Sequence, residues 1–112
     1  ASPANAMHDH LSSVRSDLRR ARRDLKNVQL AHIDTVKEKM RGFGLDVPAR
    51  KRVNTLLGLI WRSNCEGGRE FVSAETDRLR PVLSAMTARI KTLEAEEADL
   101  IAEASDGASQ HA

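Results

Sequence analysis

Two long stretches of this sequence repeat apolar residues at spacings of three and four. The first, over 11–43, places them at Leu11, Val14, Leu18, Ala21, Leu25, Val28, Val36, Met40 and Phe43, with His32 in the same line. The second, over 71–104, places them at Leu79, Leu83, Met86, Ile90, Leu93, Leu100 and Ala104, with Glu97 in line. This is the heptad spacing of helices that pack along a seam. We therefore expect two long helices of similar length.

The charges on the two stretches are opposite in sign and favour an antiparallel pair. Basic residues gather near the start of the first stretch, at Arg15, Arg19, Arg20, Arg22, Arg23 and Lys26, and acidic residues near the end of the second, at Glu94, Glu96, Glu97, Asp99 and Glu103. Folding back brings these ends together, in a register that pairs Arg15 with Asp99, Arg19 with Glu96, Arg22 with Glu94 and Phe43 with Phe71. Exposed ion pairs contribute about 0–1 kcal/mol each, so their main effect is on orientation and register.

A shorter helix is expected between the two long ones. Its apolar residues stand at i, i+3, i+4, i+7 and i+8 and form a compact stripe, namely Val53, Leu56, Leu57, Ile60 and Trp61. Asp46 is a suitable N-cap and Pro48 suits a first turn, so this helix is predicted over 47–64. Gly42 and Gly44 are suited to end the first long helix. The third helix is predicted over 70–104, with a kink at Pro81.

The sequence thus predicts an all-α protein, a long antiparallel helical hairpin of coiled-coil type with a short amphipathic helix at the turn. We expect a single helical domain over 11–104, between a flexible N-terminus over 1–10 and a flexible tail over 105–112. Residues 1–6 can be an expression remnant, with Met7 as the native start. A two-helix seam is too narrow to cover the stripe of the short helix, so we expect a homodimer that completes a helical bundle.

Residues that could carry catalysis are few and scattered. The only cysteine, Cys65, excludes an intrachain disulfide and a cysteine-based zinc site, and no base stands near it in the sequence. The His-Asp-His run at 8–10 is expected to be inert rather than a metal site. His32 is expected to be a core histidine, and Glu97 to meet an arginine across the seam or to set its register. No HExxH, GxSxG, P-loop or complete GxGxxG pattern occurs. We expect no enzyme, no metal and no cofactor.

The stripe on the short helix is the best candidate contact surface. Tryptophan is enriched among the interface residues that carry most of the binding energy. We therefore expect a partner or dimer interface made of Val53, Leu56, Leu57, Ile60 and Trp61. The alternative is that Trp61 caps the core where three helices meet. The expected function is protein–protein interaction, as an adaptor, a secretion-type chaperone or a regulator that sequesters a partner.

The arginine-rich stretch supports a second hypothesis, a small nucleic-acid-binding regulator. Its phosphate contacts would come from Arg19, Arg20, Arg22, Arg23 and Lys26. Against it, the net charge is only +2 and no known nucleic-acid-reading motif is present. No apolar run approaches the roughly 20 residues of a membrane span, and the first residues lack the features of a signal peptide. We therefore expect a cytoplasmic protein without a membrane span.

Overall fold

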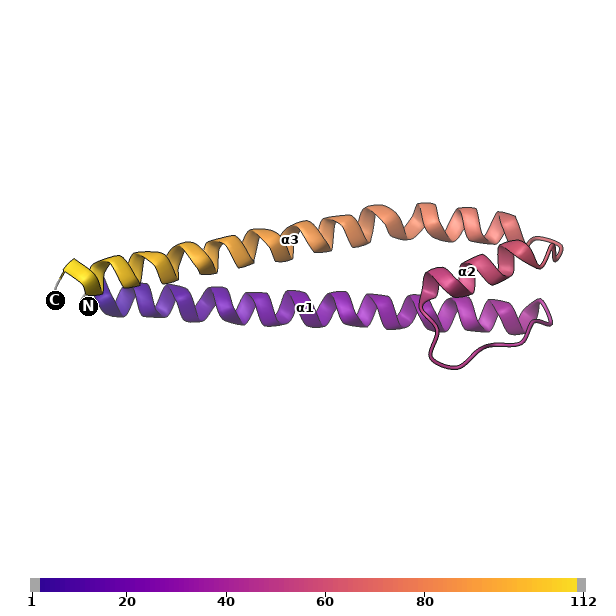
Figure 1. Ribbon diagram of the computed structural model, residues 1–112, viewed down its shortest axis with the longest axis horizontal. Coiled ribbons are helices and arrows are strands. Elements are labelled where there is room, and N and C mark those ends of the chain that lie inside the picture. Colours follow the sequence, from indigo (N-terminus) through magenta and orange to yellow (C-terminus); the bar gives the residue numbers. More distant parts are fainter. Residues whose placement is uncertain (1–2, 111–112) are drawn as a thin grey trace. The chain divides into compact units, whose positions relative to one another are not determined.

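The computed structural model describes residues 3–110, with the side chains of residues 5–106. The described chain forms three helices, α1 (Pro3–Gly42), α2 (Val53–Arg62) and α3 (Gly68–Gln110) (Figure 1). The prediction of an all-α fold is confirmed, with two long antiparallel helices and a short one at the turn between them.

The chain divides into two compact units. The terminal unit contains the chain up to Leu25 and from Ser84 onward, and the central unit is Lys26–Leu83. The terminal unit therefore consists of the first part of α1 and most of α3. The central unit contains the rest of α1, all of α2 and the first part of α3. The single domain expected from the sequence stays a prediction.

The core of the terminal unit is a two-helix seam. Its buried residues are Val14 and Leu18 from α1 and Leu93 and Leu100 from α3, flanked by Leu11, Ala21 and Ile90. All of these stand on the predicted heptad lines, so the spacing identified the faces on which the two helices pack. Because two helices alone bury a narrow stripe, most other side chains of this unit remain exposed or half-buried.

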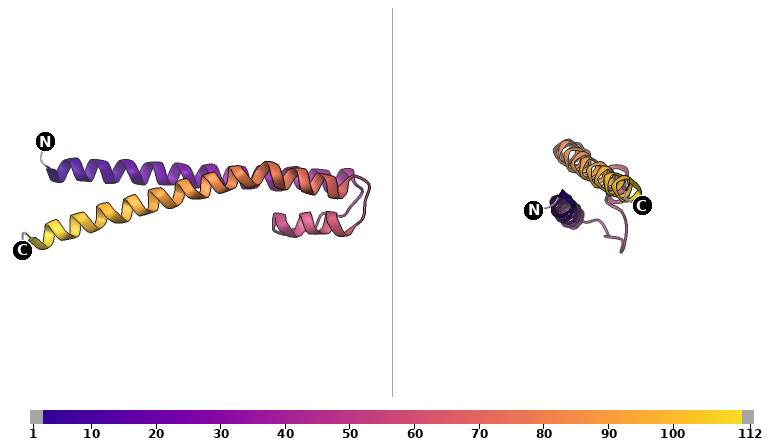
Figure 2. Two further views of the ribbon diagram at one scale, coloured as in Figure 1. Left: turned by 90° about the horizontal axis from the view of Figure 1, so that it is seen from above. Right: turned by 90° about the vertical axis from the view of Figure 1, so that its left-hand side faces the viewer.

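The core of the central unit is built by three helices. Val36 and Met40 of α1 pack with Leu56, Leu57 and Ile60 of α2, and Phe71 and Val72 of α3 pack against this cluster. The ring centroids of Phe43 and Phe71 lie 6.3 Å apart in an edge-to-face arrangement, which confirms their predicted pairing. Within this unit, α2 lies alongside the two long helices, close to the loops that connect it to α1 and to α3 (Figure 2).

The predicted end of α1 is confirmed, and its geometry explains why glycine is needed. Gly44 has φ +75°, its N–H donates to the Arg41 carbonyl at 3.0 Å, and the Leu45 N–H donates to the Met40 carbonyl at 2.9 Å. These two bonds form a Schellman motif, which places a left-handed residue just after the helix. Leu45 then packs against the central core.

The predicted start of the short helix is wrong. Residues 47–52 are not helical, and α2 begins at Val53 after Arg52, whose side chain makes no capping hydrogen bond. Val47 instead packs against the central core in an irregular conformation, and Arg50 has φ +56°. A residue in the left-handed conformation cannot continue a right-handed helix. Packing of the connecting segment against the core therefore outweighed the helix-start signals of Asp46 and Pro48.

The long helices also extend past their predicted limits. Residues 3–10 and 105–110 are helical, whereas we expected flexible ends there; residues 1–2 and 111–112 lie outside the described part of the chain. These segments continue helices that are already formed, and adding a residue to an existing helix is easier than nucleating one. Helix α3 also continues through Pro81, with its start at Gly68, close to the predicted position.

Substituting Gly44 with alanine should destabilise the protein by about 1 kcal/mol, because a Cβ is unfavourable at positive φ. Gly42, two residues earlier, provides the matched control. It is the last residue of α1, and an added Cβ would meet no atom within 4 Å. Gly42→Ala should therefore leave stability unchanged or raise it by about 0.5 kcal/mol. Urea denaturation of both variants checks the sign difference, and equal effects would contradict the role of Gly44.

Candidate functional site

The ion pairs of the terminal unit match the predicted register in part. Arg22 donates to Glu94 at 3.3 Å, as predicted. Arg15 instead donates to Glu97 at 3.2 Å, which confirms that Glu97 meets an arginine across the seam and corrects the pairing with Asp99. The reason is orientation, because Asp99 stands two residues, or about 200°, further around the helix from Glu97.

Most of the arginine-rich stretch is not neutralised by α3. Glu96, the predicted partner of Arg19, pairs with His10 at 3.2 Å. No ion pair within the described part of the chain involves the next four basic side chains, Arg19, Arg20, Arg23 and Lys26. All four are exposed. The explanation of this stretch by internal pairing therefore holds for Arg15 and Arg22 only.

Reversing the charge of Arg22 should lower stability by less than about 1 kcal/mol, because its pair with Glu94 is exposed. The loss should be larger at low salt, where screening is weaker. Arg23→Glu is the control, since Arg23 is equally basic, lies next in the chain and has no ion pair among the described residues. Thermal melts at two salt concentrations measure both. A salt-dependent loss of the same size in Arg23→Glu would refute the specific pair.

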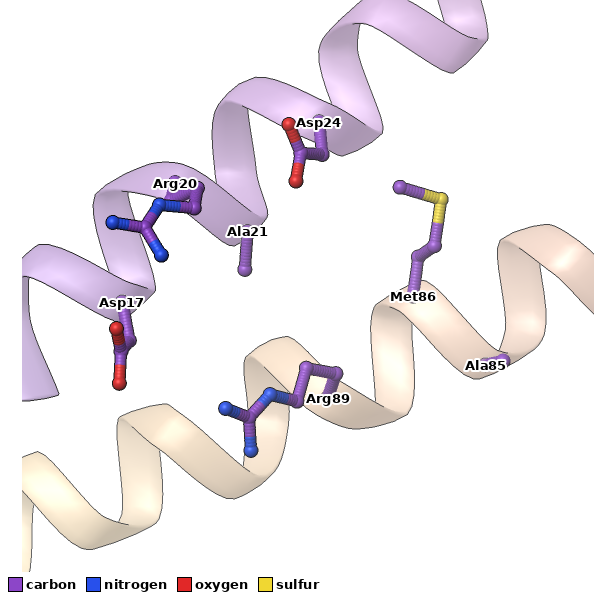
Figure 3. A pocket seen from close by; sticks show the side chains of 7 residues that line it. All are labelled: Asp17, Arg20, Ala21, Asp24, Ala85, Met86 and Arg89. Carbon is purple, nitrogen blue, oxygen red and sulfur yellow. The ribbon is translucent and has the colours of Figure 1, made fainter.

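The terminal unit has a cavity of about 350 Å³ between α1 and α3. It is lined by Asp17, Arg20, Ala21, Asp24, Ala85, Met86 and Arg89 (Figure 3). Ala21 and Ala85 are too short to fill the space between the helices, and Met86 points across it toward α1. Two carboxylates and two guanidinium groups balance one another in this lining, so the cavity favours no ligand charge.

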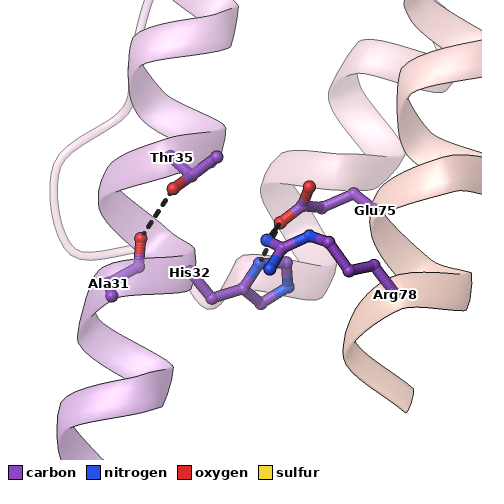
Figure 4. Close-up of polar contacts among 5 residues, drawn as sticks. All are labelled: Ala31, His32, Thr35, Glu75 and Arg78. Carbon is purple, nitrogen blue, oxygen red and sulfur yellow. Dashed lines mark hydrogen bonds and ion pairs between the residues drawn. The ribbon is translucent and has the colours of Figure 1, made fainter. Parts of the chain in front are cut away.

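A buried polar cluster joins α1 and α3 in the central unit. Glu75 Oε1 accepts a hydrogen bond from His32 Nδ1 at 3.1 Å and another from the Arg78 guanidinium (Figure 4). The His32 and Glu75 side chains are only 5% and 7% exposed. Because an ionised carboxylate only accepts, Nδ1 carries the proton of this bond. The prediction that His32 is a satisfied core histidine is confirmed.

The central unit also has an open cavity of about 400 Å³ at the N-terminal end of α2. We call it the central groove. Its lining consists of Gln29, His32, Ile33, Arg52, Val53, Asn54, Leu57, Thr76, Leu79, Arg80 and Leu83. The five aliphatic side chains come from all three helices, and no carboxylate lines the groove. The groove forms because α2 has only 10 residues and begins at Val53, so it does not cover the long helices past that residue.

The structure buries some of the predicted interface residues and leaves others accessible. Leu56, Leu57 and Ile60 are buried within the chain, so the expected interface needs correction for these three. The cause is that α1 and α3 together with α2 form a three-helix core, which covers more of the stripe than a two-helix seam would. Of the predicted set, Val53 and the edge of Leu57 line the central groove.

Trp61 lies at the opposite end of α2 from the central groove. It remains 42% exposed, and the Arg69 guanidinium carbon is 5.1 Å from its ring centroid. Arg69 also donates to the Trp61 carbonyl at 3.3 Å and to Asn64 Oδ1 at 2.9 Å. One face of the indole therefore already has a partner within the chain. A contact between Trp61 and another molecule stays a prediction.

Sequence reasoning missed several groove residues and the buried acid. Ile33 and Arg80 each stand one residue beside the heptad line, at positions that a two-helix seam leaves exposed. Glu75 stands four residues before Leu79, whereas the alternating spacing of the seam continues backward to Thr76 and Val72. The heptad line therefore gave no direct signal for Glu75, and the groove depends on where α2 begins.

Other candidate chemistry is sparse. Cys65 is half-buried and has no disulfide partner. Within the described residues, no three or more His, Cys, Asp or Glu side chains gather in a way that could hold a metal ion. None of the described helices combines the length and the apolarity required to cross a membrane. Comparisons with protein-family models, curated proteins and solved structures find no match to this chain.

Proposed function

We propose that this chain is a non-enzymatic protein–protein interaction module, an adaptor, chaperone or sequestering regulator, whose central groove receives an amphipathic helix of a partner. The carrying observation is the groove itself, in which five aliphatic side chains of three helices line one open cavity. Amphipathic helices dock in such grooves through apolar residues at spacings of three and four.

The position of the groove supports a helical occupant. Where α2 is present, three helices pack together and bury their apolar side chains. Past the N-terminal end of α2 at Val53, the segments of α1 and α3 in the central unit pack only against each other. Ile33 and Leu83 are half-buried there, whereas Val36, which lies beside α2, is fully buried. A helix that continues the course of α2 would bury these side chains, and burial is favourable by roughly 25 cal/mol per Å².

A labelled amphipathic peptide helix with a leucine seam and uncharged polar residues elsewhere tests the proposal. Its fluorescence anisotropy should rise on titration with the protein, and Asn54→Trp should weaken binding at least tenfold by filling the groove. Thr55→Trp is the matched control, because Thr55 is exposed on the same helix but does not line the groove. Equal effects of the two variants, or no binding at all, would overturn the proposal.

Self-association is part of the same proposal, with Trp61 and Val53 as the remaining candidates of the expected interface. Sedimentation equilibrium should then give a dimer, and Trp61→Ala should shift it toward monomer. A monomer at every concentration would remove the homodimer and leave the groove for a different partner.

One observation favours nucleic acid as a second candidate function. The exposed side chains of Arg19, Arg20 and Arg23 have no ion pair within the described chain, so their charge is available to phosphates. Titration of labelled duplex DNA and single-stranded RNA at two salt concentrations tests this. Binding that weakens steeply with salt and disappears when these arginines become alanine would support it, and absence of binding at low salt would exclude it.

A further inference from the structure

The charges around the central groove indicate which kind of helix it accepts. Arg52 and Arg80 line the groove, and neither pairs with a carboxylate among the side chains that the structure describes. No Asp or Glu is part of the lining. The third titratable lining residue, His32, already donates to the buried Glu75. The accessible charge of the groove is therefore positive.

The start of α2 adds to this positive potential. Helix α2 has no acidic residue in its first turn and no side-chain cap, and Arg50, Lys51 and Arg52 directly precede it. The free N–H groups and the dipole of a helix make its N-terminus positive, where acidic residues are normally preferred. Three basic residues at this place are unfavourable for the isolated chain. A carboxylate supplied from outside would relieve that repulsion.

We propose that the natural occupant of the central groove is an acidic amphipathic helix of a partner protein. Its apolar side chains contact Ile33, Leu79 and Leu83, and its Asp or Glu side chains lie against Arg52 and Arg80 and beside the start of α2. This inference rests on the proposed function and specifies the partner. Charge complementarity of this kind selects among partners more than it adds affinity.

Two further peptides, with the same leucine seam as the neutral probe, test the inference. One carries Glu at its polar positions and the other Lys. At low salt the acidic peptide should bind about tenfold more tightly than the basic one, as two exposed ion pairs allow, and the preference should shrink with added salt. The double variant Arg52→Glu/Arg80→Glu should abolish or invert the preference.

The control is Arg23→Glu/Lys91→Glu, which changes the net charge equally at two exposed positions outside the groove lining. It should keep the preference for the acidic peptide. If the neutral peptide binds but acidic and basic peptides bind alike, or if the preference survives reversal of Arg52 and Arg80, the inference fails and the proposed function stands. If no peptide binds, both fail. Duplex DNA that displaces the acidic peptide and loses binding on the Arg52/Arg80 reversal would identify the groove as a phosphate-binding surface and overturn the proposal.

Discussion

Replacing Ile60 with alanine should lower the free energy of unfolding by about 2–5 kcal/mol, among the largest losses expected from a single change in this chain. Ile60 is fully buried, and its side chain lies within the cluster that contains Val36, Met40 and Leu56. A Cβ added at Gly68 would lie 3.2 Å from Ile60 Cγ2, so the start of α3 also packs closely on this side chain. Little space is available for the neighbours to relax into the cavity.

A graded series makes this prediction sharper. Ile60→Val removes one methylene and should cost about 0.5–1.5 kcal/mol, between wild type and alanine. Leu30→Ala is the control for loss of apolar volume, because Leu30 is 50% exposed and its removal should change stability by no more than about 0.5 kcal/mol. Urea denaturation gives all three values. A loss in Ile60→Ala no larger than that of Leu30→Ala would contradict the three-helix core.

The same variant also tests the single domain expected from the sequence. Hydrogen exchange reports on each unit separately, since opening free energies differ between cooperative segments. If the two units unfold together, Ile60→Ala should lower protection in α1 near Leu18 and in α3 near Leu93 as much as in the central unit. If only the central unit loses protection, the units are independent and the single-domain prediction is wrong.

Breaking the His32–Glu75 bond from either side should destabilise the protein by about 1–3 kcal/mol, because the remaining group stays buried without its partner. In Glu75→Leu, His32 loses its acceptor. In His32→Leu, Glu75 keeps only Arg78, so this variant should be the less damaged of the two. The double variant His32→Leu/Glu75→Leu should be more stable than the sum of the single losses implies, since no unpaired polar group remains.

A double-mutant cycle in urea measures the coupling. Losses that simply add would show that the two side chains do not stabilise each other. Arg78→Ala is the control for the outer end of the cluster: the Arg78 side chain is 61% exposed, so its loss should cost less than that of His32 or Glu75. Since His32 also lines the central groove, the peptide titration should be repeated on each variant that remains folded.

Local sequence patterns were sufficient to predict the helical architecture. The heptad spacing identified both long helices and the faces on which Leu18 and Leu93 meet, and the glycine at position 44 marked the end of α1. The pairing of Phe43 with Phe71 followed from the antiparallel register. These features depend on helical periodicity and turn geometry, and both are properties of a few neighbouring residues.

The candidate site could not be predicted in the same way. Its lining depends on where α2 begins and on which side of the long helices it packs, and the capping pattern at Asp46 and Pro48 gave the wrong start. The interface expected on α2 was reduced because three of its side chains are buried within the chain. A pattern within one helix identifies an apolar stripe but not which element covers it.

The amino-acid sequence by itself determined three helices, their order and the antiparallel direction of the long pair, since spacing and charge act along the chain. The tertiary structure alone decided that Glu97 meets Arg15, that Glu75 is buried against His32, and that Ile33 and Leu83 remain partly uncovered at the end of α2. The physical reason is that burial and pairing depend on the rotation of each helix relative to its neighbours. In the terminal unit that rotation is set by two helices alone. In the central unit it is set by three, and the central groove stays open where the shortest of them begins.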